Sequence, residues 1–157
     1  MKKTTNLSSI PYTSTSLAIK GWADSKLAQS ERADCVVRAI ASAYDLPYDR
    51  AHKWVATTFG RKPKRGTYGF STGMNSMSDK GTRLNYKKAK TIDSVDLTTR
   101  GGQSKMTVGT FAKLYDKGTY IIRVTRHAFT IKDGSVVGNP TDSTQLRKVI
   151  KNAWKIQ

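Results

Sequence analysis

Two adjacent segments carry apolar residues at the three- and four-residue spacing of an amphipathic helix. The first begins after Asp34, a residue type favoured as a helix N-cap. Its apolar positions are Val36, Val37, Ile40, Ala41 and Tyr44. Pro47 interrupts the pattern and opens a second segment that ends at Gly60. The apolar face of this second segment consists of Tyr48, Ala51, Trp54, Val55 and Phe59. We therefore predict two consecutive helices, over residues 34–44 and 47–59.

In the C-terminal half the pattern becomes partly strand-like. The segment TVGTFAKLYDKG predicts a third helix, capped by Thr107 and ended by Gly118. It is followed by TYIIRVTRHAFTIKDGSVVGNP, in which two β-rich runs flank Asp133 and Gly134, a strong signal for a hairpin. The final segment STQLRKVIKNAWKI has the spacing of a short amphipathic helix. Because helices and strands are segregated along the chain, we expect an α+β fold and not a doubly wound sheet.

Two regions lack a clear hydrophobic period. Residues 1–20 are rich in serine and threonine and predict a flexible N-terminal arm, so one folded domain is expected over residues 21–157. Residues 60–90 predict a basic loop insertion with room for one short strand. This insertion is either a solvated loop or a patch that contacts polyanions. The candidate polyanion-binding residues are Arg61, Lys62, Lys64, Arg65, Lys87, Lys88 and Lys90.

Composition adds a strongly basic surface to this picture. The chain has 157 residues, and its 28 Lys and Arg against 11 Asp and Glu give a formal charge of +17, which attracts polyanions such as nucleic acid. Its one cysteine excludes an intramolecular disulfide, and a metal site is not expected with two histidines. The chain lacks both the ~20 consecutive apolar residues of a membrane span and a secretory signal. We therefore expect a soluble, intracellular protein without a cofactor.

The one cysteine, Cys35, lies in the first turn of the first predicted helix. Free backbone N–H groups and the positive end of the helix dipole favour a thiolate there, and the thiolate is the nucleophilic form of cysteine. The alternative is a small hydrophobic residue packed in the core. A catalytic thiol also requires a base. His52 suits a partly exposed helical position, whereas His127 begins the first strand of the hairpin, where rigid structure would orient it.

The length of the hairpin loop decides which residue faces His127. A three-residue loop that begins at Lys132 places His127 opposite Asn139, with about 5 Å between their Cβ atoms. A two-residue loop moves Asn139 opposite Ala128 instead. In the first register Asn139 can orient the imidazole, as the third residue of a Cys–His–Asn arrangement. Asp142 is the alternative third residue if the chain turns back after the hairpin.

Gln29 completes the candidate set, because at six residues before Cys35 its amide can face a developing oxyanion together with the Cys35 backbone N–H. In this order of residue types the chain resembles the papain-like cysteine peptidases, over residues 29–60 and 107–142. The segments ADCVVRAIASAYDLPYDRAH and TVGTFAKLYDKGTYIIRVTRHAFTIKDGSVVGN are most similar to small papain-like domains encoded by bacteriophages. In those domains a Cys-bearing helix precedes a hairpin that carries the His and usually ends in Asp. The roles that the resemblance implies are Cys35 as nucleophile, His127 as base, Asn139 as orienting residue and Gln29 as oxyanion donor.

Two functions follow from these observations. The resemblance implies a papain-like fold and a cysteine peptidase or related amide hydrolase, which acts on a peptide or protein through an acyl-enzyme. Such a protein would work in the host cytoplasm, or travel in the virion. The alternative is an inactive papain-like scaffold that binds nucleic acid or belongs to the virion, and the charge favours it. The chain departs from the family pattern at Val36, where an aromatic residue is common, and at Arg126, where a glycine often precedes the histidine.

Overall fold

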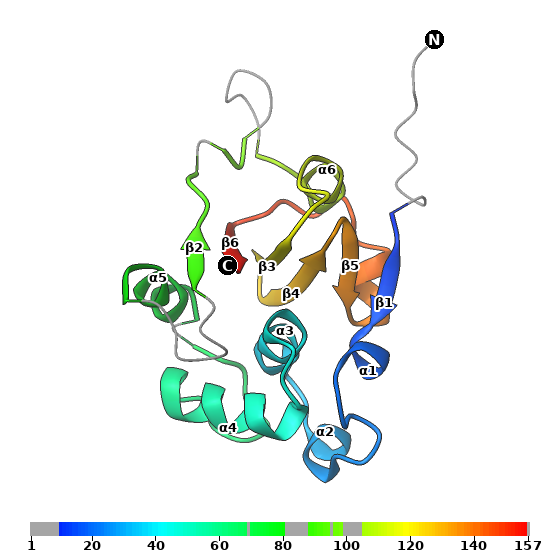
Figure 1. Cartoon of the computed structure of the whole chain (residues 1–157), viewed down its shortest axis with the longest axis vertical. Helices are drawn as coiled ribbons and strands as arrows, with labels where there is room; N and C mark the ends of the chain where they lie inside the picture. Colours follow the sequence, from blue (N-terminus) through cyan, green and yellow to red (C-terminus); the bar gives the residue numbers. More distant parts are fainter. Residues whose placement is uncertain (1–9, 69, 81–87, 95, 99–104, 157) are drawn as a thin grey trace.

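The computed structural model describes residues 10–68, 70–80, 88–94, 96–98 and 105–156, and it contains a six-stranded mixed sheet with helices on both faces (Figure 1). The helices are α1 (Thr15–Ala18), α2 (Lys26–Ser30), α3 (Cys35–Tyr44), α4 (Tyr48–Phe59), α5 (Phe70–Lys80), α6 (Val108–Leu114) and the 3-10 helix η3 (Pro140–Ser143). The strands are β1 (Tyr12–Ser14), β2 (Ala89–Thr91), β3 (Thr119–Val124), β4 (His127–Lys132), β5 (Ser135–Gly138) and β6 (Asn152–Ile156). The predicted α+β class is confirmed.

Helices α3 and α4 form where the apolar periodicity predicts them. Asp45 ends α3 in the left-handed conformation with a φ of 54°, and Gly60 ends α4 in the same conformation with a φ of 69°. The start of α3 differs from the prediction, because Asp34 makes no side-chain capping bond. Its carboxylate instead accepts hydrogen bonds from Arg38 Nε at 3.1 Å and from the Tyr48 hydroxyl at 2.6 Å. Asp34 therefore ties α3 to α4 in addition to preceding the first turn.

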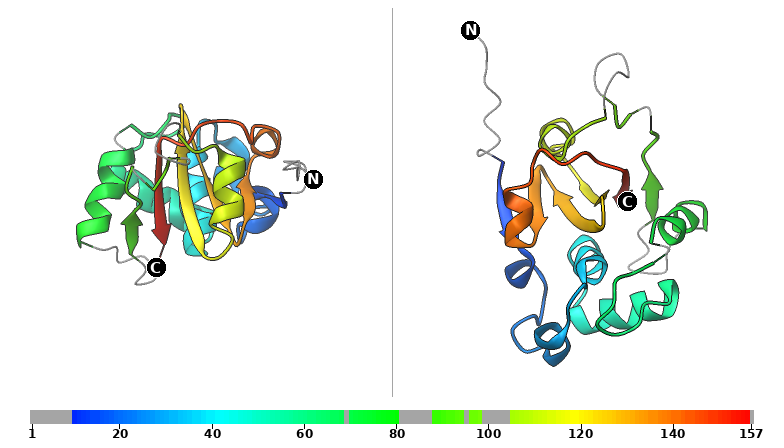
Figure 2. Two further views of the ribbon diagram at one scale, coloured as in Figure 1. Left: turned by 90° about the horizontal axis from the view of Figure 1, so that it is seen from above. Right: turned by 180° about the vertical axis from the view of Figure 1, so that it is seen from behind.

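The sheet has the strand order β1-β5-β4-β3-β6-β2, in which β1 runs parallel to β5 and the other paired strands are antiparallel. Two apolar clusters pack on its opposite faces. One joins α3, α4 and α5 to Ile121 and Trp154, and the other joins α6 to Ile122 and Phe129. The two faces can be followed in Figures 1 and 2. Helix α3 packs on β4, and this contact places Cys35 near His127.

The β4–β5 hairpin adopts the two-residue loop. Asp133 and Gly134 have φ values of 49° and 77°, and Lys132 pairs directly with Ser135. Both loop residues thus adopt the positive φ of a tight hairpin turn. The three-residue register, which would place Asn139 opposite His127, is therefore wrong for this chain. Strand β5 ends at Gly138, and the chain turns away into η3.

The C-terminal segment forms a strand where we predicted an amphipathic helix. Strand β6 lies between β3 and β2 and pairs with both. Both sheet faces are covered there, so Ala153 is buried on one face and Trp154 on the other. Apolar spacing in so short a segment fits a helix and a strand alike, and pairing with β3 decides between them.

Two other predictions also change. Residues 12–18 belong to β1 and α1, so the predicted arm is shorter than 1–20; residues 1–9 lie outside the described ranges. In the basic region, β2 provides the predicted short strand, but α5 forms where we predicted a loop. Phe70 and Met74 of α5 are buried and pack in the cluster that contains α3, which explains why this helix forms. Within the described ranges, every helix is too short or too polar to cross a bilayer.

Candidate active site

Cys35 is the first residue of α3, and its side chain lies partly exposed at the edge of the apolar cluster. Backbone N–H groups in the first turn of a helix have no partner within the helix, and they face toward the same end as the thiol. The rest of α3 is buried apart from Arg38, so the helix holds this end in place. Cys35 lines two cavities and is therefore accessible, which a fully packed core residue would not be.

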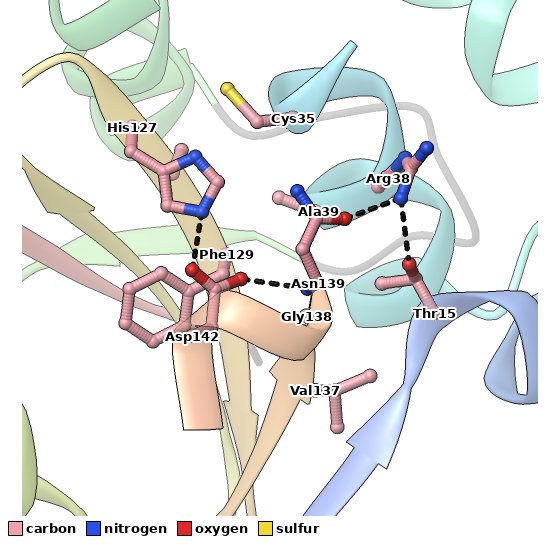
Figure 3. A pocket seen from close by; sticks show the side chains of 11 residues that line it. Thr15, Cys35, Arg38, Ala39, His127, Phe129, Val137, Gly138, Asn139 and Asp142 are labelled. Atoms are coloured by element: carbon pink, nitrogen blue, oxygen red, sulfur yellow. Dashed lines mark hydrogen bonds and ion pairs between the residues drawn. The ribbon is translucent and has the colours of Figure 1, made fainter. Parts of the chain in front are cut away.

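His127 is the first residue of β4 and is positioned by the hairpin between β3 and β4. Val124 pairs with His127 across a two-residue turn, Thr125 and Arg126. The imidazole ring lies 5.8 Å from the ring of Phe129, with the two planes 27° apart. Its side chain is 20% exposed. As Figure 3 shows, the imidazole lies between Cys35 and Asp142, with one nitrogen on the side of each.

Asp142, and not Asn139, contacts the imidazole. Its Oδ1 lies 2.7 Å from His127 Nε2, and its Oδ2 accepts the backbone N–H of Asn139 at 2.7 Å. This second bond is part of the capping box of η3, so the helix that follows β5 fixes the carboxylate. A Cβ at Gly138 would overlap Asp142, which explains why a glycine precedes the turn. The predicted contact between Asn139 and the imidazole is therefore wrong, and Asp142, the alternative that the sequence left open, makes this contact instead.

Asn139 still lines the site, in a different position from the one we predicted. Its Oδ1 accepts a hydrogen bond from Arg38 Nη1. Arg38 is held in turn by Asp34, at 3.1 Å, and its guanidinium lies 4.6 Å from the centre of the Trp22 ring. Because a guanidinium only donates, this contact fixes which amide atom faces it and leaves Nδ2 free to donate elsewhere. Asn139 lines both cavities together with Cys35 and His127 (Figure 3).

The structure does not bring Gln29 into this group. Gln29 lies on α2, is exposed and donates from Nε2 to the carbonyl of Trp22 at 3.2 Å. It lines neither of the two cavities that contain Cys35. The six-residue spacing predicted proximity, but a bend in the chain between α2 and α3, with Ala33 at a φ of 54°, separates them. Arg38 is a residue of the site that the sequence analysis did not identify. Its spacing of four residues from Asp34, at the start of the Cys-bearing helix, is the pattern of an ion pair and could have indicated it.

The environment of His127 favours the imidazolium. Burial lowers the pKa of His127, but hydrogen bonds to Asp142 and Cys35 and the charges of both groups outweigh it and raise the pKa to about 9. His127 is therefore charged at neutral pH, beside a thiol. The ordinary pKa of histidine is 6.5, so the stabilisation of the folded state by the interactions of the His127 imidazolium has its full value below pH 6.5. That contribution is lost as the pH rises through about 9.

Replacing Asp142 by asparagine tests the His127 contact directly. We expect the Asp142→Asn change to lower the pKa of His127 by roughly one to three units, because it removes the adjacent negative charge. Titration of the imidazole Cε1–H by NMR measures this, with Cys35→Ser and Cys35→Ser/Asp142→Asn compared so that only the contact with Asp142 differs between the two proteins. An unchanged pKa for His127 would exclude the contact with Asp142.

The predicted polyanion-binding residues divide into two groups. The prediction that Arg61 binds polyanions is wrong. Its side chain is 0% exposed and its Nη2 lies 2.5 Å from Glu31 Oε2, so Arg61 is a buried structural residue. His52 also contacts this carboxylate, at 3.2 Å, which gives it a structural role. The exposed candidates are Lys62, Lys64, Arg65, Lys88 and Lys90. Lys87 lies outside the described residues, and binding of polyanions by the exposed group stays a prediction.

Comparison of the chain with protein-family models, curated proteins and solved structures finds no match. Any assignment of function therefore depends on the chemistry of the side chains that the fold brings together. These are a partly exposed thiol at a helix N-terminus, a charged imidazole beside it and a buried carboxylate behind the imidazole.

Proposed function

We propose that this protein is a cysteine hydrolase with a papain-like fold, which cleaves a peptide or related amide bond through an acyl-enzyme. The observation that carries the proposal is the position of His127, whose imidazole lies beside the Cys35 side chain in the same cavity and 2.7 Å from the Asp142 carboxylate on its other side (Figure 3). A nucleophile, a base within its reach and a third group that orients the base are the recurring parts of covalent acyl transfer. Asp142 takes the orienting role that the resemblance to papain-like peptidases implied for Asn139.

The arrangement of the secondary structure also supports this proposal. A helix that begins with the cysteine packs against an antiparallel part of the sheet whose strand begins with the histidine. This arrangement resembles the two halves of a papain-like domain. An Asp after the hairpin also matches the small phage-encoded domains to which the two quoted segments are similar, and origin from a phage is part of the proposal.

In the proposed reaction the Cys35 thiolate attacks the carbonyl carbon of the scissile amide, and the carbonyl π electrons move to oxygen. Two groups can donate to this oxyanion: the backbone N–H of Cys35 and Asn139 Nδ2, whose orientation Arg38 fixes. The imidazolium of His127 then gives its proton to the leaving amine as the C–N bond breaks, which leaves a thioester. Neutral His127 next removes a proton from water, the hydroxide attacks the thioester, and the acid and the thiolate are released. Asp142 holds the imidazole in one orientation through both steps.

The reactivity of Cys35 toward iodoacetamide tests the proposal without a known substrate. At pH 6, where His127 is charged, we expect wild-type Cys35 to be alkylated at least about tenfold faster than Cys35 in His127→Ala, because the imidazolium stabilises the thiolate. The rate is followed by mass spectrometry on intact protein. His52→Ala is the matched control and should react as the wild type does, since His52 contacts Glu31.

Equal rates in the wild type and His127→Ala would contradict an activated pair. A thiol that reacts only after denaturation would do the same, and the chain would then fit the inactive basic scaffold better than the hydrolase.

A further inference from the structure

A groove of about 810 Å³ opens beside Cys35 and is the larger of the two cavities that contain it. It runs between the first turn of α3, the segment that leads into α5, and the turn between β3 and β4. Cys35, His127 and Asn139 lie on its wall, so a substrate that reaches the thiol must occupy it. The smaller cavity, drawn in Figure 3, extends from the same three residues towards Asp142.

The free charges on the wall of the groove are positive. Arg126 is exposed on the turn directly before His127, and Arg123 lies half-buried on β3. Arg123 donates from Nε to Asn152 at 2.8 Å, a contact that orients its guanidinium and leaves the Nη groups available. The one carboxylate in the lining is Asp34, which is buried and accepts from Arg38 and Tyr48. Among the described lining residues, no carboxylate therefore balances the two arginines.

The backbone at Arg126 adds a second observation. Arg126 has a φ of 58°, in the left-handed region, where glycine is the residue of least cost. The chain nevertheless has an arginine here, with its side chain next to the catalytic imidazole. A hairpin turn needs no charge for its geometry, so the turn alone does not explain this residue.

Two further groups in the lining suit an extended peptide. Tyr68 is 84% exposed on the wall of the groove, where its aromatic face is available to pack against a bound peptide. The Thr67 hydroxyl is shielded from solvent and makes no hydrogen bond within the described part of the chain. A buried polar atom of this kind is normally satisfied, and the backbone of a bound peptide would satisfy it.

We propose that the groove selects peptide substrates that carry a carboxylate close to the scissile bond, and that Arg126 and Arg123 bind this carboxylate. The inference rests on the proposed function for the meaning of the scissile bond, but binding can be measured without cleavage. A carboxylate can come from an Asp or Glu side chain or from a free C-terminus. Both present the same planar pair of oxygens to a guanidinium.

Binding of fluorescein-labelled peptides to the Cys35→Ser protein tests the inference by fluorescence anisotropy. Three octapeptides are compared: one blocked at both ends with Glu at its centre, its Gln counterpart, and a Gln peptide with a free C-terminus. We expect the carboxylate-bearing peptides to bind at least about tenfold more tightly than the blocked Gln peptide. The better of the two identifies the source of the carboxylate.

Variants at Arg126 separate the groove from the general basic surface. Arg126→Gln should remove most of the preference, and Arg126→Gly should do the same while relieving the left-handed backbone. Arg126→Glu should reverse it in favour of a Lys peptide. Arg147→Gln is the matched control, because Arg147 is exposed, lies outside the groove and carries the same charge. It should keep at least half of the wild-type affinity.

Equal binding of Glu and Gln peptides, or equal losses in Arg126→Gln and Arg147→Gln, would overturn the inference. Cys35-dependent cleavage without a charge preference would overturn it and leave the proposed hydrolase intact. Charge-selective binding that depends on Arg126, without any cleavage by the wild type, would support the groove and count against the hydrolase.

Discussion

Replacing Cys35 by alanine should abolish the proposed hydrolysis, with kcat/KM lowered by at least about 10⁴-fold, because it removes the thiol that forms the acyl-enzyme in the proposed mechanism. His127→Ala should cost about as much, since residues that act as a unit do not contribute additively. The assay uses peptides with a carboxylate near the scissile bond and follows the products by mass spectrometry. Circular dichroism and thermal unfolding should show an intact fold, because Cys35 is only partly buried.

Asn139→Ala provides the graded comparison for this result. If Asn139 Nδ2 donates to the oxyanion, its loss should lower kcat by about 10²–10³-fold while alkylation of Cys35 at pH 6 is unchanged. A role in orienting His127 would lower both. Retention of more than a tenth of the activity in Cys35→Ala would exclude the acyl-enzyme mechanism.

The second large effect concerns stability and involves the buried pair of Arg61 and Glu31. The two side chains are 0% and 3% exposed, and their closest atoms lie 2.5 Å apart. Arg61→Met should lower the free energy of unfolding by about 3–5 kcal/mol, because it leaves the Glu31 carboxylate buried without its main partner. Urea denaturation measures the loss, and Lys62→Met, an exposed neighbour, should change stability by less than about 0.5 kcal/mol.

The double variant Glu31→Met/Arg61→Met separates charge from packing. Because it removes both charges, it should recover at least half of the loss seen in Arg61→Met. It should not recover all of it, since the Lys64 N–H also donates to Glu31 at 2.8 Å and loses its acceptor. A double variant as unstable as Arg61→Met would show that the side-chain volume matters and the charge does not. The pair also matters for the site, because Arg61 donates to the carbonyl of Arg32 in the segment that leads to Cys35.

Local patterns in the sequence were sufficient for the elements whose interactions are local. The periodicity of α3 and α4, the Pro47 between them and the Asp-Gly turn of the hairpin all depend on neighbours within a few residues. The same reasoning selected Cys35 and His127, because a helix N-terminus and the first residue of a strand can be recognised from the chain alone. The sequence also limited the third residue to Asn139 or Asp142 without deciding between them.

The remaining decisions depended on contacts between distant parts of the chain. The sequence pattern of β6 fits a helix as well as a strand, and its place between β3 and β2 made it a strand. A one-residue change in hairpin register moved Asn139 away from His127, and η3 then brought Asp142 to the imidazole. Arg61 had the sequence context of a surface cation, yet packing against Glu31 buried it. Residue spacing along the chain specifies local conformation. The group that pairs with a charged side chain or with the edge of a strand can come from any part of the chain, so the tertiary structure decides it. The sequence alone was therefore enough to propose Cys35 and His127 as nucleophile and base, while the contact of Asp142 with the imidazole and the place of Arg123 beside the same groove required the tertiary structure.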